Sequence, residues 1–172
     1  MNTRTLVVLS LFVGIGATLH LLIPGSLYMK PDMSLLMMFI GILLFPGVKN
    51  VLLLGLATGV LAGLTTTFPG GFLPNLIDKP ITAFLFYGIV IVTSKYARTV
   101  IGAALLTVLG TVTSGILFLG SAFLIVGLPA PFMALIVTAV LPATVLNGLL
   151  IGVMYPVVQS VMKRSSLMQP AA

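Results

Sequence analysis

Six stretches of apolar residues alternate along the chain with short segments rich in proline, glycine and charge. The apolar stretches carry almost no charged residues, a pattern typical of helices that cross a lipid bilayer. Pairs such as Pro24-Gly25 and Pro46-Gly47 separate them, because proline lacks an amide donor and glycine favours non-helical angles. We therefore predict an all-α integral membrane protein with a single transmembrane domain over residues 1–172. Its six expected helices cover approximately residues 5–23, 33–45, 50–66, 81–94, 99–126 and 132–162, with an outer loop at 67–80.

The second and the sixth stretch differ from the others in length. A second helix over residues 33–45 would rise only about 20 Å, less than the hydrocarbon core of about 30 Å. We therefore expect its neighbours, or a water-filled pocket, to shield it from lipid. The long sixth stretch contains Pro142, which frees the carbonyl of Thr138 and is expected to kink the helix.

The composition indicates that lipid, rather than water, surrounds much of the apolar surface. Hydrophobic residues make up 59% of the 172 residues and charged residues only 6%, whereas soluble domains carry about a quarter charged residues. The net charge of +6 comes mostly from Lys and Arg at one set of helix ends. This favours anchoring to the headgroups of the lipid bilayer, and we expect no nucleic-acid partner.

The charged residues divide between the two sides of the predicted membrane. One side carries Arg4, Lys49, Lys95, Arg98, Lys163 and Arg164, and the other carries Lys30, Asp32, Asp78 and Lys79. Because basic residues near span ends stay in the cytoplasm, this division predicts that both termini are cytoplasmic. The first stretch continues to Ile23 and leads into further spans, so we expect a retained helix rather than a cleaved signal peptide.

Small residues recur at every fourth position in two of the predicted helices. They are Gly55, Gly59 and Gly63 in the third helix and Ser10, Gly14 and Thr18 in the first. This spacing allows a second helix to approach closely. We expect both stripes to pack within the chain. The alternative is contact with a partner protein, and for the first helix a partner-docking surface.

The segment 65–80 is the richest in polar residues. It is too apolar for a solvated loop and too interrupted by proline and glycine for a continuous helix, which indicates a re-entrant loop or a pocket lid. Asp78 either caps the fourth helix, with Pro80 in its first turn, or contacts a ligand. Asp32 is in the same way a cap of the second helix, a ligand contact or both, and Lys30 reaches either headgroups or the ligand.

The two doublets Lys30/Asp32 and Asp78/Lys79 bring both signs of charge to the expected outer mouth. A zwitterionic amino acid needs a cation for its carboxylate and an anion for its ammonium, so these residues are candidates for substrate binding. Aromatic and methionine side chains nearby provide either apolar pocket surface or, as is more common, core packing. They are Phe68, Phe72, Phe84 and Phe86, and Met29, Met33, Met37 and Met38.

Two further polar residues lie within predicted spans. His20 is near the outer end of the first helix, and Asn147 follows Pro142 in the last. Polar groups inside a membrane are functional candidates, although interhelical hydrogen bonding is the simpler explanation for each. Both are candidate substrate-binding residues.

The inventory of reactive side chains argues against an enzyme. Glutamate and cysteine are absent, histidine occurs once, and no phosphate-binding loop of the Gly-x4-Gly-Lys-Ser/Thr type is found. We therefore predict no catalytic residues, no bound metal and no cofactor. Transport remains, and none of the predicted spans contains an Asp or Glu that would serve as an internal proton carrier.

Two motifs resemble the bacterial tryptophan transport protein family. They are Met-Lys-Pro-Asp-Met at 29–33, continuing through Met-Met-Phe-Ile-Gly-Ile-Leu-Leu-Phe-Pro at 37–46, and the segment 65–80 with its Phe-Pro-Gly-Gly and Asn-x-x-Asp-Lys-Pro elements. The resemblance covers nearly the whole chain. That family is in turn similar to the substrate-binding S components of energy-coupling factor transporters, which have six spans and both termini inside.

The resemblance implies a protein that captures tryptophan from outside, with Lys30, Asp32, Asn75, Asp78 and Lys79 in the pocket. It also implies docking of the first helix on a membrane coupling subunit driven by two ATPases. In S components the docking helix carries an alanine-x3-alanine pattern, whereas this chain has Ser10, Gly14 and Thr18. Two alternatives remain: a solitary amino-acid permease without an ATPase, and a non-transporting membrane scaffold or assembly protein.

Overall fold

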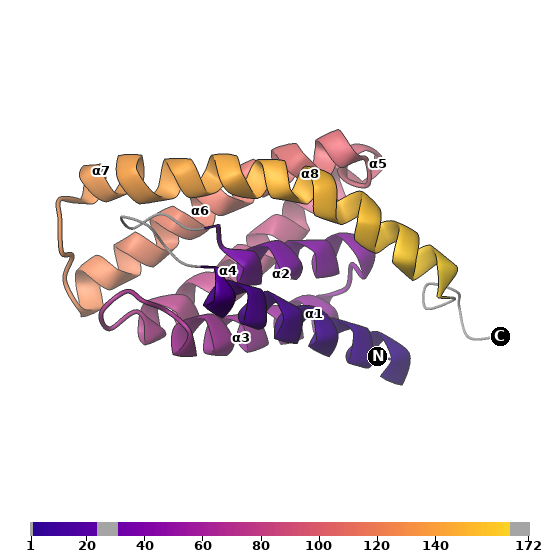
Figure 1. The fold of residues 1–172 in the computed structure, drawn as a ribbon, viewed down its shortest axis with the longest axis horizontal. Helices are drawn as coiled ribbons and strands as arrows, with labels where there is room; N and C mark the ends of the chain where they lie inside the picture. The colour runs from indigo at the N-terminus through magenta and orange to yellow at the C-terminus, as the bar shows by residue number, and fades with distance from the viewer. Residues whose placement is uncertain (1, 24–30, 166–172) are drawn as a thin grey trace.

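The computed structural model describes residues 2–23 and 31–165. These residues form a bundle of helices and contain no β-strand (Figure 1). Within these residues, helices follow the order of the apolar stretches predicted from the sequence. The elements are α1 (Thr3–Leu22), α2 (Met33–Leu44), α3 (Val48–Leu64), α4 (Phe72–Val92), the short α5 (Ser94–Ala97), α6 (Val100–Ile125), α7 (Phe132–Leu135), the π-helical turn η1 (Ile136–Val140) and α8 (Leu141–Arg164).

Four helical rods in the described residues are long and apolar enough to cross a membrane. They are α1, α4, α6 and the continuous rod of α7, η1 and α8, whereas α2 and α3 are shorter apolar helices. Large apolar side chains are exposed along all four long rods. An apolar surface of this extent needs lipid or protein to cover it.

The short helix α2 lies at the centre of the bundle. All 12 of its residues are buried, and it packs against α1, α3, α4, α6 and α8. Phe39 of α2 stacks on Phe86 of α4 with 4.0 Å between the ring centroids. A helix of this length rises only about 18 Å, and the surrounding rods shield it. The expected shielding by neighbours is therefore confirmed.

The glycine stripe of α3 packs against α4. A Cβ atom at Gly55 would lie 2.9 Å from the Cα of Pro80, and one at Gly59 would lie 3.1 Å from the carbonyl oxygen of Asn75. A Cβ atom at Gly63 would meet the ring of Phe72 at 2.8 Å. The expected packing within the chain is confirmed, and the stripe is not available to a partner.

The second stripe, on α1, has the opposite environment. Ser10, Gly14 and Thr18 are exposed, and a Cβ atom at Gly14 would meet nothing within 4 Å. The glycine of α1 that packs inward is Gly16, where a Cβ atom would lie 3.1 Å from the Cβ of Met37. The expectation that this stripe packs within the chain is therefore wrong, because the larger apolar side chains of α1 occupy its inward face.

The fourth helix begins earlier than predicted, which corrects the expected outer loop 67–80. Residues Phe72–Pro80 are helical, and only residues 65–71 connect α3 to α4. Pro74 stands in the first turn, where its missing amide donor would have had no helical partner. Pro80 lies inside the helix, beside Gly55. Membrane helices tolerate such a proline.

This longer α4 changes the position of its charged residues. Asp78 and Lys79 lie in the body of a helix that is long enough to span a membrane. Asp78 is therefore not a helix cap, and the prediction that no span contains a carboxylate is wrong.

The last rod departs from regular α-helix just before Pro142. The π-helical turn η1 covers Ile136–Val140, and the amide of Leu141 donates to the carbonyl oxygen of Ile136. The Thr138 hydroxyl donates to the carbonyl oxygen of Ala134 at 2.7 Å. The irregularity expected from Pro142 thus takes the form of a π-helical turn, and such turns are frequent at functional sites.

The two ends of the bundle differ in charge. Helix α1 begins and α8 ends at the same end (Figure 1), together with the start of α3 and the end of α4. This end of the bundle carries six basic residues: Arg4, Lys49, Lys95, Arg98, Lys163 and Arg164. The opposite end holds the end of α1, the beginnings of α2 and α4 and the segment 65–71, and the cavity that these segments line lies toward it.

Candidate substrate-binding site

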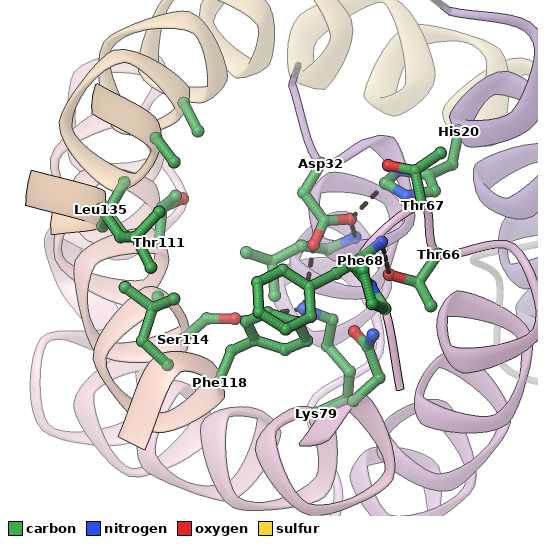
Figure 2. A pocket seen from close by; sticks show the side chains of 18 of the residues that line it. His20, Asp32, Thr66, Thr67, Phe68, Lys79, Thr111, Ser114, Phe118 and Leu135 are labelled. Carbon is green, nitrogen blue, oxygen red and sulfur yellow. Dashed lines mark hydrogen bonds and ion pairs between the residues drawn. The ribbon is translucent and has the colours of Figure 1, made fainter. Parts of the chain in front are cut away.

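A cavity of about 440 Å³ lies between several segments of the chain. The end of α1, the start of α2, the segment 65–71, α4, α6 and the rod that begins at α7 all contribute to its wall. This volume is typical of a site for a small organic molecule. Figure 2 shows charged and hydroxyl side chains gathered at one part of the cavity and two aromatic rings facing them.

Lys79 forms the centre of the charged part. Its Nζ atom is 2.9 Å from Oδ2 of Asp32, 2.8 Å from Oδ2 of Asp78 and 3.2 Å from the hydroxyl of Ser114 (Figure 2). The side chain of Lys79 is only 3% exposed. Removing one member of such a buried ion pair leaves an uncompensated charge and costs roughly 3–5 kcal/mol.

Asp78 lies behind Lys79 and is fully buried. Its Oδ1 atom accepts a hydrogen bond from the Thr82 hydroxyl at 2.7 Å, one helical turn away in α4. Its Oδ2 atom accepts one from the Ser114 hydroxyl of α6 at 2.8 Å, in addition to that from Lys79. Every contact of this carboxylate is therefore to the protein, and Asp78 is not part of the cavity wall.

Asp32 is the carboxylate that faces the cavity. It caps α2, because its Oδ1 atom accepts a hydrogen bond from the amide of Leu35 at 2.9 Å. Its side chain is nevertheless 23% exposed, and His20 Nδ1 lies 3.7 Å from Oδ1. Burial alone would raise the pKa of the Asp32 carboxyl, but the neighbouring charges of Lys79 and His20 bring it down to about 2. Asp32 is therefore ionised at neutral pH.

Asn147 supports Asp32 from the last helix. Its Oδ1 atom accepts a hydrogen bond from the backbone amide of Asp32 at 3.1 Å, and its Nδ2 atom donates to the hydroxyl of Thr111 at 3.3 Å. Asn147 is completely buried and does not line the cavity. It therefore ties α8 to α2 and α6, as the interhelical interpretation of this residue expects.

Apolar side chains line the rest of the cavity, and two aromatic rings lie close to the charged residues (Figure 2). Phe68 from the segment 65–71 and Phe118 from α6 meet edge to face, with 5.2 Å between the ring centroids. Leu119 and Leu135 lie beside them in the wall. The amide of Phe68 donates to the hydroxyl of Thr66 at 3.2 Å, which orders the turn that carries the ring.

Four of the seven residues predicted to bind substrate line the cavity: His20, Asp32, Asn75 and Lys79. Asn75 also donates from Nδ2 to the carbonyl oxygen of Gly71 at 2.8 Å. Asp78 and Asn147 lie directly behind this wall. Lys30 lies outside the described residues.

The aromatic and methionine residues named as candidates also divide between the cavity wall and other parts of the structure. Phe68 lines the cavity, whereas Phe72 and Phe84 are exposed and Phe86 is in the core with Met33, Met37 and Met38. Met29 lies outside the described residues.

Sequence reasoning missed the contribution of α6. Thr111, Ser114 and Phe118 line the cavity, and the first two bind Asn147 and the Lys79 cluster. Thr107, Thr111 and Ser114 follow one another at spacings of four and three residues, which places them on one face of α6. This polar stripe in an apolar helix is the signal that would have identified them.

A lipid-compatible helical bundle with an ion-paired cavity toward one end defines the class: a multi-pass membrane protein built to bind a small solute. The family follows from sequence comparison. The family model described as "Tryptophan transporter TrpP" matches residues 2–163. The chain belongs to this tryptophan transporter family.

Three relatives are similar to this chain over nearly its whole length, and each bears the name "Probable tryptophan transport protein". The Bacillus subtilis (strain 168) protein is 54% identical over 172 residues, which cover 99% of each chain. The Clostridium acetobutylicum protein is 42% identical over 95% of this chain and 96% of its own. The Clostridium perfringens protein is 38% identical over 97% of each. No solved structure matches the chain.

Family membership confirms three predictions made from the sequence. The chain resembles bacterial tryptophan transport proteins, as its motifs indicate. It is a transport protein rather than an enzyme, and it is a multi-pass protein of the bacterial cell membrane.

Proposed function

We propose that this chain takes up tryptophan by binding it in the cavity between α2, α4 and α6 and passing it toward the cytoplasm. The names of the relatives support tryptophan as the solute. The observation that carries the proposal is the pairing of a buried ionic cluster with two aromatic rings in one cavity. Tryptophan combines a zwitterionic end with a large apolar ring and so requires both surfaces.

The expected membrane orientation has the cavity open to the outside. The end of the bundle that carries most of the Lys and Arg residues would face the cytoplasm, because basic span ends are retained there. Both termini are then inside, with six spans if the two short helices α2 and α3 are counted. In this arrangement the segment 65–71, which carries Phe68, lies between the ligand and the external medium.

The energy source in this proposal is an ATP-driven partner, as in the S components that the chain resembles. The exposed stripe Ser10, Gly14 and Thr18 supports this, because a smooth surface on an outer helix lets another protein approach closely. The chain would then act as the substrate-binding component. A coupling subunit with its ATPases would move the loaded protein within the bilayer.

A solitary permease is the second candidate, and one observation favours it. Asp78 places a carboxylate in the body of α4, and membrane carboxylates recur in carriers driven by protons or ions. Uptake into vesicles that contain only this protein separates the two candidates. Tryptophan accumulation without ATP or partner subunits supports the permease, and accumulation only after both are added supports the S-component assignment.

The non-transporting scaffold is the weakest alternative. It would use the Gly55/Gly59/Gly63 face for a stable partner, but that face is filled by α4. A scaffold would also show no saturable ligand.

Calorimetry on the purified protein tests tryptophan binding directly. We expect saturable binding of tryptophan, and a thermal-shift panel of amino acids and vitamins should show its largest stabilisation with tryptophan. Charge removal by Asp78→Asn or Lys79→Met should abolish binding while the protein still inserts into the membrane. Unchanged affinity in both variants would contradict this pocket assignment.

A second pair of variants tests the pocket assignment without altering the charged cluster, so it remains informative if the charge variants misfold. Phe118→Ala removes an aromatic ring from the cavity, whereas Phe123→Ala removes one that is 62% exposed on the same helix. We expect tryptophan affinity to fall at least about tenfold in the first variant, since buried aromatic contacts contribute roughly 1–3 kcal/mol. The second variant should bind as the natural protein does.

A further inference from the structure

The ammonium of Lys79 has no donor left for a ligand. An ammonium group carries three N–H donors. Oxygen atoms of Asp32, Asp78 and Ser114 lie within 3.2 Å of Nζ and account for all three. A ligand carboxylate would have to displace one of these oxygens, two of which belong to carboxylates at 2.9 and 2.8 Å.

The charges of this cluster do not balance. Two carboxylates share one ammonium, so the three side chains together carry one negative charge in excess when both carboxylates are ionised and His20, 3.7 Å from Asp32, is uncharged. Asp78 is enclosed by protein donors, whereas Asp32 is 23% exposed toward the cavity. The excess negative charge is therefore presented to a ligand at Asp32. A buried uncompensated charge is costly, and a positively charged ligand group would neutralise it.

The geometry of Asp32 suits an ammonium ligand. Its Oδ1 and Oδ2 atoms each accept one hydrogen bond, from Leu35 and Lys79, and each carboxylate oxygen has a second lone pair. The capping bond and the bond from Asn147 to its backbone hold the residue in place. Figure 2 shows its carboxylate between His20 and Lys79, with the Phe68 ring nearby.

We infer that this cavity selects its ligand by a primary ammonium group bound at Asp32, so that aromatic amines without a carboxylate are also ligands. Lys79 is then a positioning residue that holds Asp32, rather than the group that binds the ligand carboxylate. This inference rests on the proposed function, because it assigns the two ends of a tryptophan-like ligand within the same cavity. It extends the substrate class from the amino acid to arylalkylamines.

Three indole compounds separate the two ends of the ligand. They are tryptophan, tryptamine (which lacks the carboxylate) and indole-3-propionic acid (which lacks the amine). Calorimetry should use the full-length protein at about pH 7.5, where an unperturbed imidazole is mostly neutral. We expect tryptamine to bind within about tenfold of tryptophan and indole-3-propionic acid at least about 30-fold more weakly, the range of a charge-assisted hydrogen bond.

The opposite order would overturn the inference. If indole-3-propionic acid binds within tenfold of tryptophan while tryptamine does not, the carboxylate is the recognised end. The proposed tryptophan uptake would stand in that case. If tryptophan itself shows no saturable binding, the proposed function fails, which is a different result.

Asp32→Asn tests the residue itself and keeps the fold. Asparagine is as good a helix cap as aspartate, so α2 should retain its N-terminus. We expect tryptophan and tryptamine to lose at least about 30-fold in affinity while indole-3-propionic acid is unaffected or improved. Asp32→Glu keeps the charge and should recover part of the amine affinity. Equal losses for all three compounds in Asp32→Asn would show that Asp32 has only a structural role.

Discussion

The two small-residue stripes have the same spacing and opposite environments. On α3, Gly55 and Gly59 lie against α4 so closely that a Cβ atom would meet backbone atoms at 2.9 and 3.1 Å. On α1, Gly14 faces open space, with nothing within 4 Å of a Cβ atom. The spacing therefore indicates that a helix can be approached closely. It does not indicate which helix, in the same chain or another, makes the approach.

The two stripes differ in environment because the two helices contribute different side chains to the hydrophobic core. The inward face of α1 carries Leu9, Phe12 and Val13, which fill space beside α2. The small residues of α1 are then left on the outer face. Helix α3 has no comparable aromatic side chain, and its glycines instead allow α4 to bring Asn75 and Lys79 close to the centre of the bundle.

The largest effect is expected from a bulky residue in the α3 stripe. In Gly59→Leu the new Cβ atom would lie 3.1 Å from the carbonyl oxygen of Asn75 and 3.5 Å from the Cβ of Lys79, and the rest of the side chain would need further space. Separating α3 from α4 should cost about 3 kcal/mol or more and displace the Lys79 cluster. Thermal unfolding in detergent should show a lower midpoint, and calorimetry should show no tryptophan binding. A variant with natural stability and affinity would contradict the packing described for this stripe.

The same change in the α1 stripe should leave folding and binding intact. In Gly14→Leu the side chain points away from the bundle, so purified protein should bind tryptophan with unchanged affinity. If the stripe docks on an energising partner, tryptophan uptake by cells should nevertheless fall at least about tenfold, because a leucine would hold the partner helix away. Uptake at the natural rate would remove the support that this stripe gives to a docked partner.

Alanine substitutions should give the smallest changes in stability, and they compare the two stripes directly. Gly55→Ala should destabilise the protein by about 1–3 kcal/mol, because the Cα of Pro80 leaves no room for a methyl group. Gly14→Ala should be neutral or stabilise by up to about 1 kcal/mol, since alanine is the better helix former. Denaturant unfolding followed by circular dichroism measures both. Equal effects would mean that the two stripes do not differ in packing.

The sequence predicted the cavity in part, and the reasons are physical. Asp32, Lys79 and His20 stand out because charged and titratable groups are rare in apolar helices. The sequence predicts Asp78 at a helix end, since Pro80 follows it, but α4 begins at Phe72 and accommodates Pro80 in its interior. Phe118 could not be distinguished from the other apolar residues of α6, because what sets it apart is its contact with Phe68, 50 positions away in the chain.

Hydropathy and charge by themselves determined an all-helical membrane protein, with most of the basic residues of its described part at one end of the bundle. These properties depend on how each segment meets lipid or water, and neighbouring residues are enough to set them. The tertiary structure alone decided that α2 is the central helix, that Lys79 joins Asp32 to Asp78, and which small-residue stripe is exposed. These outcomes depend on which helices are neighbours, and that is set by packing and ion pairing between segments far apart in the chain.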